Sequence, residues 1–182
     1  MDFPLIRTFE VSPLLTSFLN KKFDQYKKEE DGRYNPNSNF DQEKGYQSEN
    51  LLDWSDKKFE NFIDSELKKL VSNQLKLDES KFSYHWIHFL DYEKGGSMEY
   101  HNHAHNEDFV MFVYLKDCDG GETVFNLNNY DEDSFKRTQV SIRPSKDRAA
   151  IFSSLVYHCG KHTEEEKRIF VVGIKIDTSG KY

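Results

Sequence analysis

The chain has 182 residues, enough for one domain with a hydrophobic core, and 36% of them are hydrophobic. Its formal net charge of −7 argues against a nucleic-acid-binding protein, because such proteins usually carry a basic patch. Its two cysteines are too few for a disulfide framework, and no apolar run reaches the ~18 residues that span a bilayer, so we expect a cytoplasmic protein with no membrane contact.

The N-terminal region, residues 1–80, is predicted to be helical with one long loop. It begins without a basic segment followed by an apolar run, so we expect no signal peptide. Ser12 and Pro13 are typical of a helix start, and apolar residues then recur at helical spacing. Residues 31–50 are rich in Asn, Gly, Ser and charge, which predicts a loop. A second amphipathic helix is expected after Asp53.

From residue 81 to 178 the pattern changes to short strands separated by turns. The predicted strands lie near 82–91, 97–103, 109–116, 122–126, 137–143, 149–153 and 168–176. Many short strands at this spacing are typical of a sandwich or barrel. We therefore predict a single domain over 1–182, mainly β, in which N-terminal helices pack against one sheet of a jelly roll.

A histidine-rich turn and a distant histidine suggest a metal site. His101 and His103 are two residues apart, a spacing that places both side chains on one face of an extended strand. His158 follows the strand that ends in AIFSS and stands in a Tyr-His-Cys-Gly segment read here as a turn. Imidazole is a common metal ligand near neutral pH. The alternative is a histidine-rich surface turn that binds nothing.

Arg168 stands inside an apolar strand and has the same parity as Phe170, Val172 and Ile174. If that face points inward, the guanidinium is buried and requires a partner, because an unpaired buried charge is very costly. Its planar fork matches a carboxylate. That carboxylate belongs either to a protein Asp or Glu or to a bound diacid.

These motifs together resemble the 2-oxoglutarate- and Fe(II)-dependent dioxygenases, most closely the prolyl 4-hydroxylase branch. The similarity covers roughly Tyr84 to Ile176, about half of the chain. It is carried, in order, by His101-x-His103, Val-Tyr114-Leu, GGETVF at 120–125, Pro144, the Ala-Ile-Phe strand end, His158-Cys-Gly and Arg168.

The resemblance implies a double-stranded β-helix fold and a catalytic set of His101, His158 and Arg168. His101 and His158 would hold iron, and Arg168, helped by the Tyr114 hydroxyl, would bind the distal carboxylate of 2-oxoglutarate. Tyr92 lies where the family often places a residue that contacts this co-substrate. The implied cofactors are Fe(II), 2-oxoglutarate and O2, with ascorbate as a further candidate. The implied substrate is a peptide, a protein or an amino acid, hydroxylated at a prolyl or other residue.

One position departs from the family, because its carboxylate ligand should stand where this chain has His103. The usual iron site of this class has two histidines and one carboxylate. Three interpretations are open. In the first, His103 is the third ligand; in the second, it is no ligand and leaves a coordination position free. In the third interpretation, the local register differs, with a His105-x-Glu107 motif, and Glu107 or Asp108 supplies the carboxylate. We favour His103 as the ligand, because Glu107 leaves too little room for a turn before the strand at Phe109.

Two other functions compete with the oxygenase. A three-His metal enzyme of the cupin type would not use 2-oxoglutarate, and Arg168 would have no role in it. A catalytically inactive binding relative would explain the missing carboxylate, although His101, His158 and Arg168 are all present.

Overall fold

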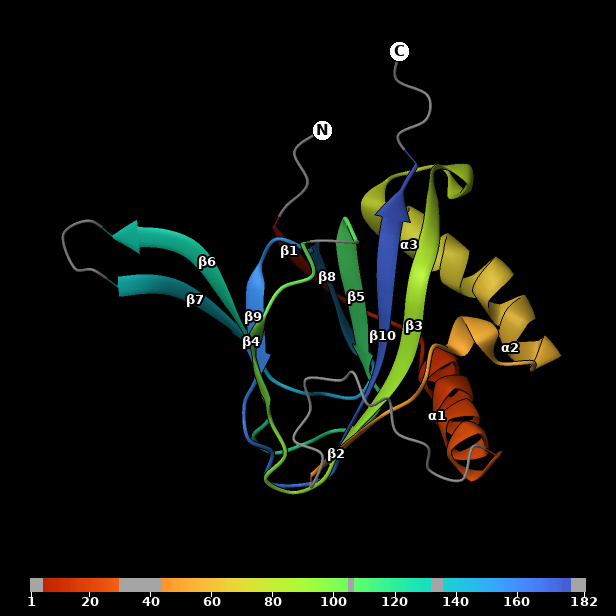
Figure 1. Ribbon diagram of the computed structural model, residues 1–182, viewed down its shortest axis with the longest axis horizontal. Helices are drawn as coiled ribbons and strands as arrows, with labels where there is room; N and C mark the ends of the chain where they lie inside the picture. The colour runs from red at the N-terminus through yellow and green to blue at the C-terminus, as the bar shows by residue number, and fades with distance from the viewer. Residues whose placement is uncertain (1–4, 30–43, 105–106, 132–135, 178–182) are drawn as a thin grey trace, which may run out of the picture.

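The computed structural model describes residues 5–29, 44–104, 107–131 and 136–177. Within these residues ten strands form two antiparallel sheets that face each other, and helices cover the outer face of the larger sheet (Figure 1). This is the jelly roll with N-terminal helices that the sequence predicts.

The larger sheet has six strands in the order β1-β8-β5-β10-β3-β2. Their bounds are β1 Ile6–Glu10, β2 Gly45–Gln47, β3 Phe82–Tyr92, β5 Phe109–Tyr114, β8 Arg148–Ser153 and β10 Lys167–Ile176. The smaller sheet has the order β4-β9-β6-β7. Its strands are β4 Met98–His101, β6 Thr123–Asp131, β7 Lys136–Ile142 and β9 Tyr157–Gly160. In Figure 1, β6 and β7 extend outward as a hairpin.

Helix α1, Pro13–Glu29, begins where the sequence predicts, because the Ser12 hydroxyl accepts a hydrogen bond from the Leu15 amide at 3.2 Å. The second predicted helix is present as α2 Lys57–Phe62, a π-helical turn Ile63–Leu67 and α3 Lys68–Leu75. The Asp56 carboxylate caps its start by accepting from the Phe59 amide at 2.8 Å. Two 3-10 turns, Leu51–Asp53 and Glu79–Lys81, flank this helical segment. None of the helices described is long and apolar enough to span a membrane.

Three sequence-based expectations require correction. The predicted loop 31–50 contains a strand, since β2 pairs with β3 along Gly45–Gln47, while residues 30–43 lie outside the described part of the chain. Strand β1 was not predicted, and it pairs with β8. The segment around His158 is not a turn but strand β9.

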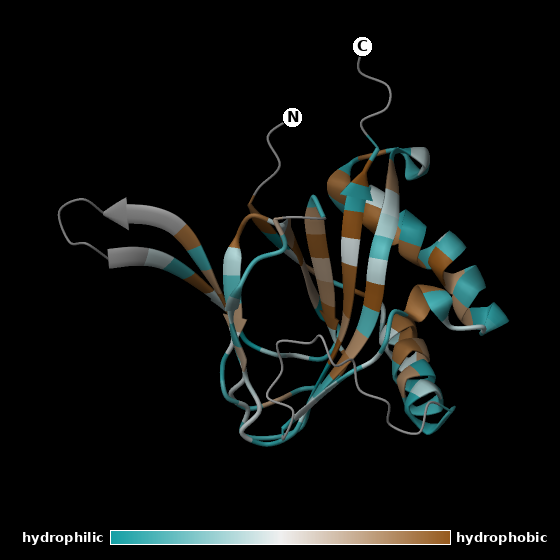
Figure 2. Ribbon diagram, in the orientation of Figure 1, coloured by the Kyte–Doolittle hydropathy of each residue, from teal (hydrophilic) through white to brown (hydrophobic). Residues whose placement is uncertain are grey.

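The core has two compartments, one on each face of the larger sheet. The first lies between this sheet and the helices and includes Phe23, Phe59 and Phe170. The second lies between the two sheets and includes Phe112, Phe125 and Ile169. The central strands β5 and β10 therefore bury both faces, and Figure 2 shows β5 as almost entirely hydrophobic.

Candidate metal centre and co-substrate cavity

His101, His103 and His158 converge between the two sheets. Strands β4 and β9 pair with His101 directly opposite His158, and their ring centroids lie 4.3 Å apart. His103 follows the end of β4, and its ring lies 5.0 Å from that of His101 and 5.3 Å from that of His158. One ring nitrogen from each lies within 4.8 Å of the others. Among the described residues, no carboxylate joins these three histidines.

Backbone carbonyls fix the orientation of two of the rings. His101 Nδ1–H donates to the Glu99 carbonyl at 2.8 Å, and His158 Nδ1–H donates to the Val156 carbonyl at 3.1 Å. A carbonyl accepts only, so the proton is on Nδ1 and the Nε2 lone pair is free to bind a metal. Such outer hydrogen bonds are the usual support for metal-binding histidines.

All three imidazoles are neutral near pH 7. Burial, reinforced by the neighbouring histidines, lowers the pKa of His158 to about 3 and that of His103 to about 4. Burial also lowers the pKa of His101. Three neutral nitrogen donors fit a divalent transition metal such as Fe(II), Zn(II), Ni(II) or Cu(II).

The histidines border a cavity of about 240 Å³. Most of its wall is apolar and comes from strands β3, β5, β8 and β10: Leu90, Val110, Phe112, Phe152, Ile169 and Val171. Gln47, Trp86 and His88 also line it, and none of the three was predicted as a site residue from the sequence. Trp86 and His88 share the strand parity of Tyr92, which was the available signal.

Lys167, which the sequence analysis also missed, is buried beside this cavity. Its side chain is fully inaccessible, and its ammonium lies 3.9 Å from the centre of the Tyr92 ring. It donates one hydrogen bond, to the Gly121 carbonyl at 2.9 Å, and pairs with no carboxylate among the described residues. Burial lowers its pKa to about 8. A buried ammonium with no carboxylate in direct contact suits an anionic ligand.

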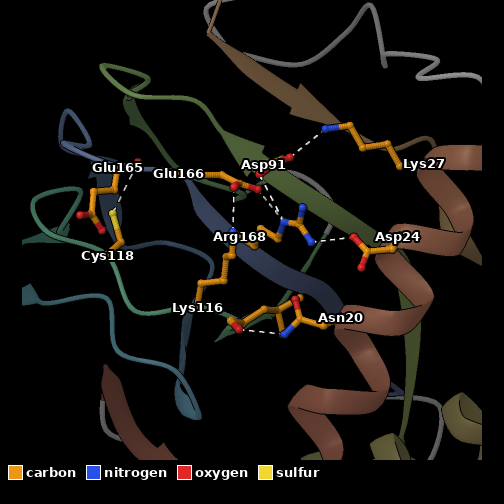
Figure 3. A network of polar contacts seen from close by, with 10 residues as sticks. Asn20, Asp24, Lys27, Asp91, Lys116, Cys118, Glu165, Glu166 and Arg168 are labelled. Atoms are coloured by element: carbon orange, nitrogen blue, oxygen red, sulfur yellow. Dashed lines mark hydrogen bonds and ion pairs between the residues drawn. The ribbon is translucent and has the colours of Figure 1, made fainter.

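Arg168 does not reach the cavity. It lies on the helix-facing side of β10, where its guanidinium contacts Asp24 at 2.7 Å and Glu166 at 2.9 Å, with Asp91 at 3.7 Å (Figure 3). The guanidinium also packs 4.4 Å from the Phe23 ring centre. The expectation that Arg168 contacts 2-oxoglutarate is therefore corrected. Its partners are carboxylates of the protein, which was the alternative expectation.

The reason for this error is that β10 is buried on both faces. Phe170, Val172 and Ile174 do share a face with Arg168, but that face meets the helices. Ile169 and Val171 share the other face with Lys167 and line the cavity. An apolar face on a strand of this kind does not indicate which side holds the site.

The two tyrosines expected near the co-substrate lie close to Lys167 or to the cavity wall. Tyr92 lines the cavity and stands opposite Lys167 in the β3–β10 pairing. The buried Tyr114 hydroxyl lies 2.6 Å from the Thr123 hydroxyl and donates to the Ile142 carbonyl at 3.2 Å. Thr123 itself lines the cavity, so Tyr114 supports the wall at that point.

The carboxylates considered as an alternative third ligand are engaged elsewhere. Glu107 accepts from the Trp86 indole, and Asp108 accepts from the Ile176 amide at 2.8 Å. Neither belongs to the histidine group, so that interpretation is wrong for them. His105 lies outside the described residues.

Comparison with known proteins identifies the domain. Residues 87–174, just under half of the chain, match the model of the 2OG-Fe(II) oxygenase superfamily. The matched segment includes the three histidines and Lys167. Over these residues the chain is thus similar to the 2-oxoglutarate- and Fe(II)-dependent oxygenase superfamily. A search of curated sequences found no match.

Solved structures with this fold include prolyl hydroxylases. A Pseudomonas putida prolyl-4-hydroxylase has a TM-score of 0.64 at 13% identity, covering 94% of this chain and 92% of that one. A Trichoplax adhaerens prolyl hydroxylase, in complex with a hypoxia inducible factor peptide fragment, has a TM-score of 0.69 at 13% identity, with coverages of 96% and 84%.

Other structures with this fold bind different molecules. HygX from Streptomyces hygroscopicus, with nickel, 2-oxoglutarate and hygromycin B bound, has a TM-score of 0.68 at 11% identity, covering 96% of this chain and 83% of that one. The chain spans only 54% of the length of a Burkholderia pseudomallei oxidoreductase of the same family. At these identities the likeness defines the fold.

Proposed function

We propose that this chain is a 2-oxoglutarate- and Fe(II)-dependent oxygenase that hydroxylates a C–H bond of a peptide, protein or amino-acid substrate. The observation that carries the proposal is one cavity with three convergent histidines and, beside Tyr92 and Gly160 of its wall, a buried ammonium with no carboxylate in contact among the described residues. A prolyl residue is our first candidate for the hydroxylated group.

In this proposal His101, His103 and His158 hold the metal through Nε2. Lys167 binds the distal carboxylate of 2-oxoglutarate, as a charge-assisted hydrogen bond in a buried site is among the stronger polar contacts. Tyr92 provides the surface on which the Lys167 ammonium rests, and Tyr114 orients the Thr123 hydroxyl beside it. The apolar wall around Phe112 and Phe152 excludes water from the reaction.

When bound, the metal and 2-oxoglutarate together supply the activation of O2 that ends in succinate, CO2 and a hydroxylated product. The protein residues bind and orient the co-substrate and protect it from water. Ascorbate would serve to keep the iron reduced. The two cysteines, Cys118 and Cys159, are free and buried, which is consistent with a reducing compartment such as the cytoplasm.

The test is turnover of 2-oxoglutarate to succinate under air with added Fe(II) and ascorbate, comparing the native protein with His158→Ala. Uncoupled turnover is sufficient, so no substrate is required. We expect activity in the native protein and none in the variant. Equal background rates in both would contradict the proposal.

A second candidate is a three-His metal enzyme that does not use 2-oxoglutarate. It is favoured by the histidine at the third position, which leaves the full charge on the metal and admits zinc or copper more readily. Lys167 argues against it, because that enzyme has no need for a buried ammonium. Metal binding without any stabilisation by 2-oxoglutarate would support this candidate.

A further inference from the structure

The third histidine of the cluster is held differently from the other two. Its backbone amide donates to the Ser154 carbonyl at 2.9 Å, but its ring makes no hydrogen bond to any residue that the structure describes. The His103 ring instead packs between aromatic neighbours, stacked on His158 at 5.3 Å and tilted against Trp86 at 5.4 Å. The orientation of the His103 ring therefore depends on packing. Its aromatic neighbour outside the histidine cluster is Trp86.

Trp86 is itself fixed by a buried carboxylate. Its indole N–H donates to Glu107 Oε1 at 2.6 Å, and the Glu107 side chain is only 4% exposed. The same oxygen lies 2.6 Å from His85 Nδ1. A carboxylate is costly to bury and is retained where several donors satisfy it.

Gly173 provides the space that this arrangement needs. It stands opposite Trp86 in the β10–β3 pairing. A Cβ at this position would lie 2.4 Å from Trp86 Cε2 and 2.9 Å from Glu107 Cγ, so only glycine allows both side chains to pack against β10. The indole also stacks with His88, whose ring lies 5.3 Å away at an interplanar angle of 28°.

We infer that Glu107 and Trp86 are positioning residues that set the orientation of His103 for metal binding. This inference rests on the proposed metal centre. It gives a role to a carboxylate that lies near the cluster in sequence but does not join it: Glu107 acts on the metal through the indole and the third imidazole. His103 depends on this support, because its ring donates to no carbonyl in the part of the chain that the structure describes.

The first test measures metal affinity without turnover. Co(II) binding is titrated in the native protein, Glu107→Ala, Glu107→Gln, His103→Ala and the double variant Glu107→Ala/His103→Ala. We expect Glu107→Ala to weaken binding about tenfold or more, as for other outer-sphere partners of ligating histidines. Glu107→Gln keeps an oxygen acceptor for the indole N–H and should remain within about threefold of the native protein.

The double variant distinguishes positioning from general damage. If Glu107 acts through His103, its removal adds no further loss once His103 is absent. Equal losses in the presence and absence of His103 would overturn the inference, as would an unchanged affinity in Glu107→Ala. Melting temperatures of the metal-free variants show whether a fold defect accounts for the loss.

A second readout needs no metal. In the metal-free protein, Glu107→Ala should shift or broaden the NMR signals of the His103 ring and leave those of His162 unchanged, because His162 is held separately by the Gly95 carbonyl at 3.0 Å. Unchanged His103 signals would overturn the inference. If the native protein binds no Co(II), the proposed metal centre fails, while the His103 signals still report whether Glu107 orients that ring.

Discussion

Lys167 and Arg168 are consecutive on β10, and their side chains lie on opposite faces of the larger sheet. The Lys167 ammonium contacts the Tyr92 ring on the cavity side. The Arg168 guanidinium pairs with Asp24 of α1 on the helix side (Figure 3). Their cross-strand partners are likewise consecutive, since Lys167 stands opposite Tyr92 and Arg168 opposite Asp91. One cation is therefore buried on the cavity side of the sheet, and its neighbour joins a helix to the sheet.

We predict that Lys167→Met raises the KM for 2-oxoglutarate about 30-fold or more, with little change in Co(II) affinity. The expected loss is that of one partner of a buried charge pair. Arg168→Gln is the matched control, and it should lower the unfolding free energy while leaving the KM within about threefold. Steady-state kinetics and denaturant unfolding measure the two effects. A larger KM effect in Arg168→Gln than in Lys167→Met would restore Arg168 to the site.

The affinity for 2-oxoglutarate should fall above pH 8. The pKa of Lys167 in the unliganded protein is about 8, and only the protonated amine binds a carboxylate well. Above this pH we expect the Kd to rise by up to tenfold per pH unit. In Lys167→Arg, whose cation keeps its proton, the Kd should stay constant. Calorimetry at several pH values distinguishes the two proteins, and identical profiles would contradict the assignment.

The stability of the unliganded protein should show the opposite trend. Lys167 has a folded-state pKa of about 8, below its ordinary value of 10.5, so the unfolded chain binds more protons between these values. Stability from this residue therefore rises with pH across that window. Lys167→Met should remove the rise, which denaturant unfolding from pH 8 to 10 would detect. If the stability of the native protein does not rise over this pH range, the pKa of Lys167 is not lowered.

The substitution His103→Asp restores the carboxylate of the usual iron site. We expect it to keep metal binding and to shift preference from zinc and copper towards Fe(II), because one negative charge is added. His103→Ala should lower metal affinity about tenfold or more. Metal competition followed by elemental analysis measures the preference. A His103→Ala protein with native affinity would show that His103 is not a ligand.

Gly121, which precedes β6, should be required for stability and for the packing of the Lys167 side chain. Gly121 has a φ of +66°, and a Cβ there would lie 2.8 Å from Thr163 Cγ2 and 3.3 Å from Lys167 Cδ. We expect Gly121→Ala to lower the unfolding free energy by more than the ~1–2 kcal/mol of left-handed backbone strain alone. Gly95→Ala is the control, since its φ is +82° and its nearest neighbour is 3.6 Å away, on the Lys44 side chain. Equal losses in both variants would show that the contact at Gly121 adds nothing.

The sequence by itself determined the jelly roll and the histidine cluster. Strand periodicity and turn residues are local, and the two-residue spacing of His101 and His103 fixes a shared face through the geometry of an extended chain. The motif order then joined His158 to this group, although its segment was expected to be a turn and is strand β9. These features depend on neighbours in sequence or on the spacing of a few residues along the chain.

Only the tertiary structure decided which cation lies on the cavity side of the larger sheet and what supports the third histidine. Strand β10 is apolar on both faces, so its pattern could not tell the Lys167 side from the Arg168 side. That choice depends on the packing of α1, through Asp24 and Phe23, against one face. The contact of Glu107 with Trp86 joins β3 to the start of β5 across 21 residues of sequence. Such contacts arise from sheet pairing and packing between distant segments, and no local pattern encodes them.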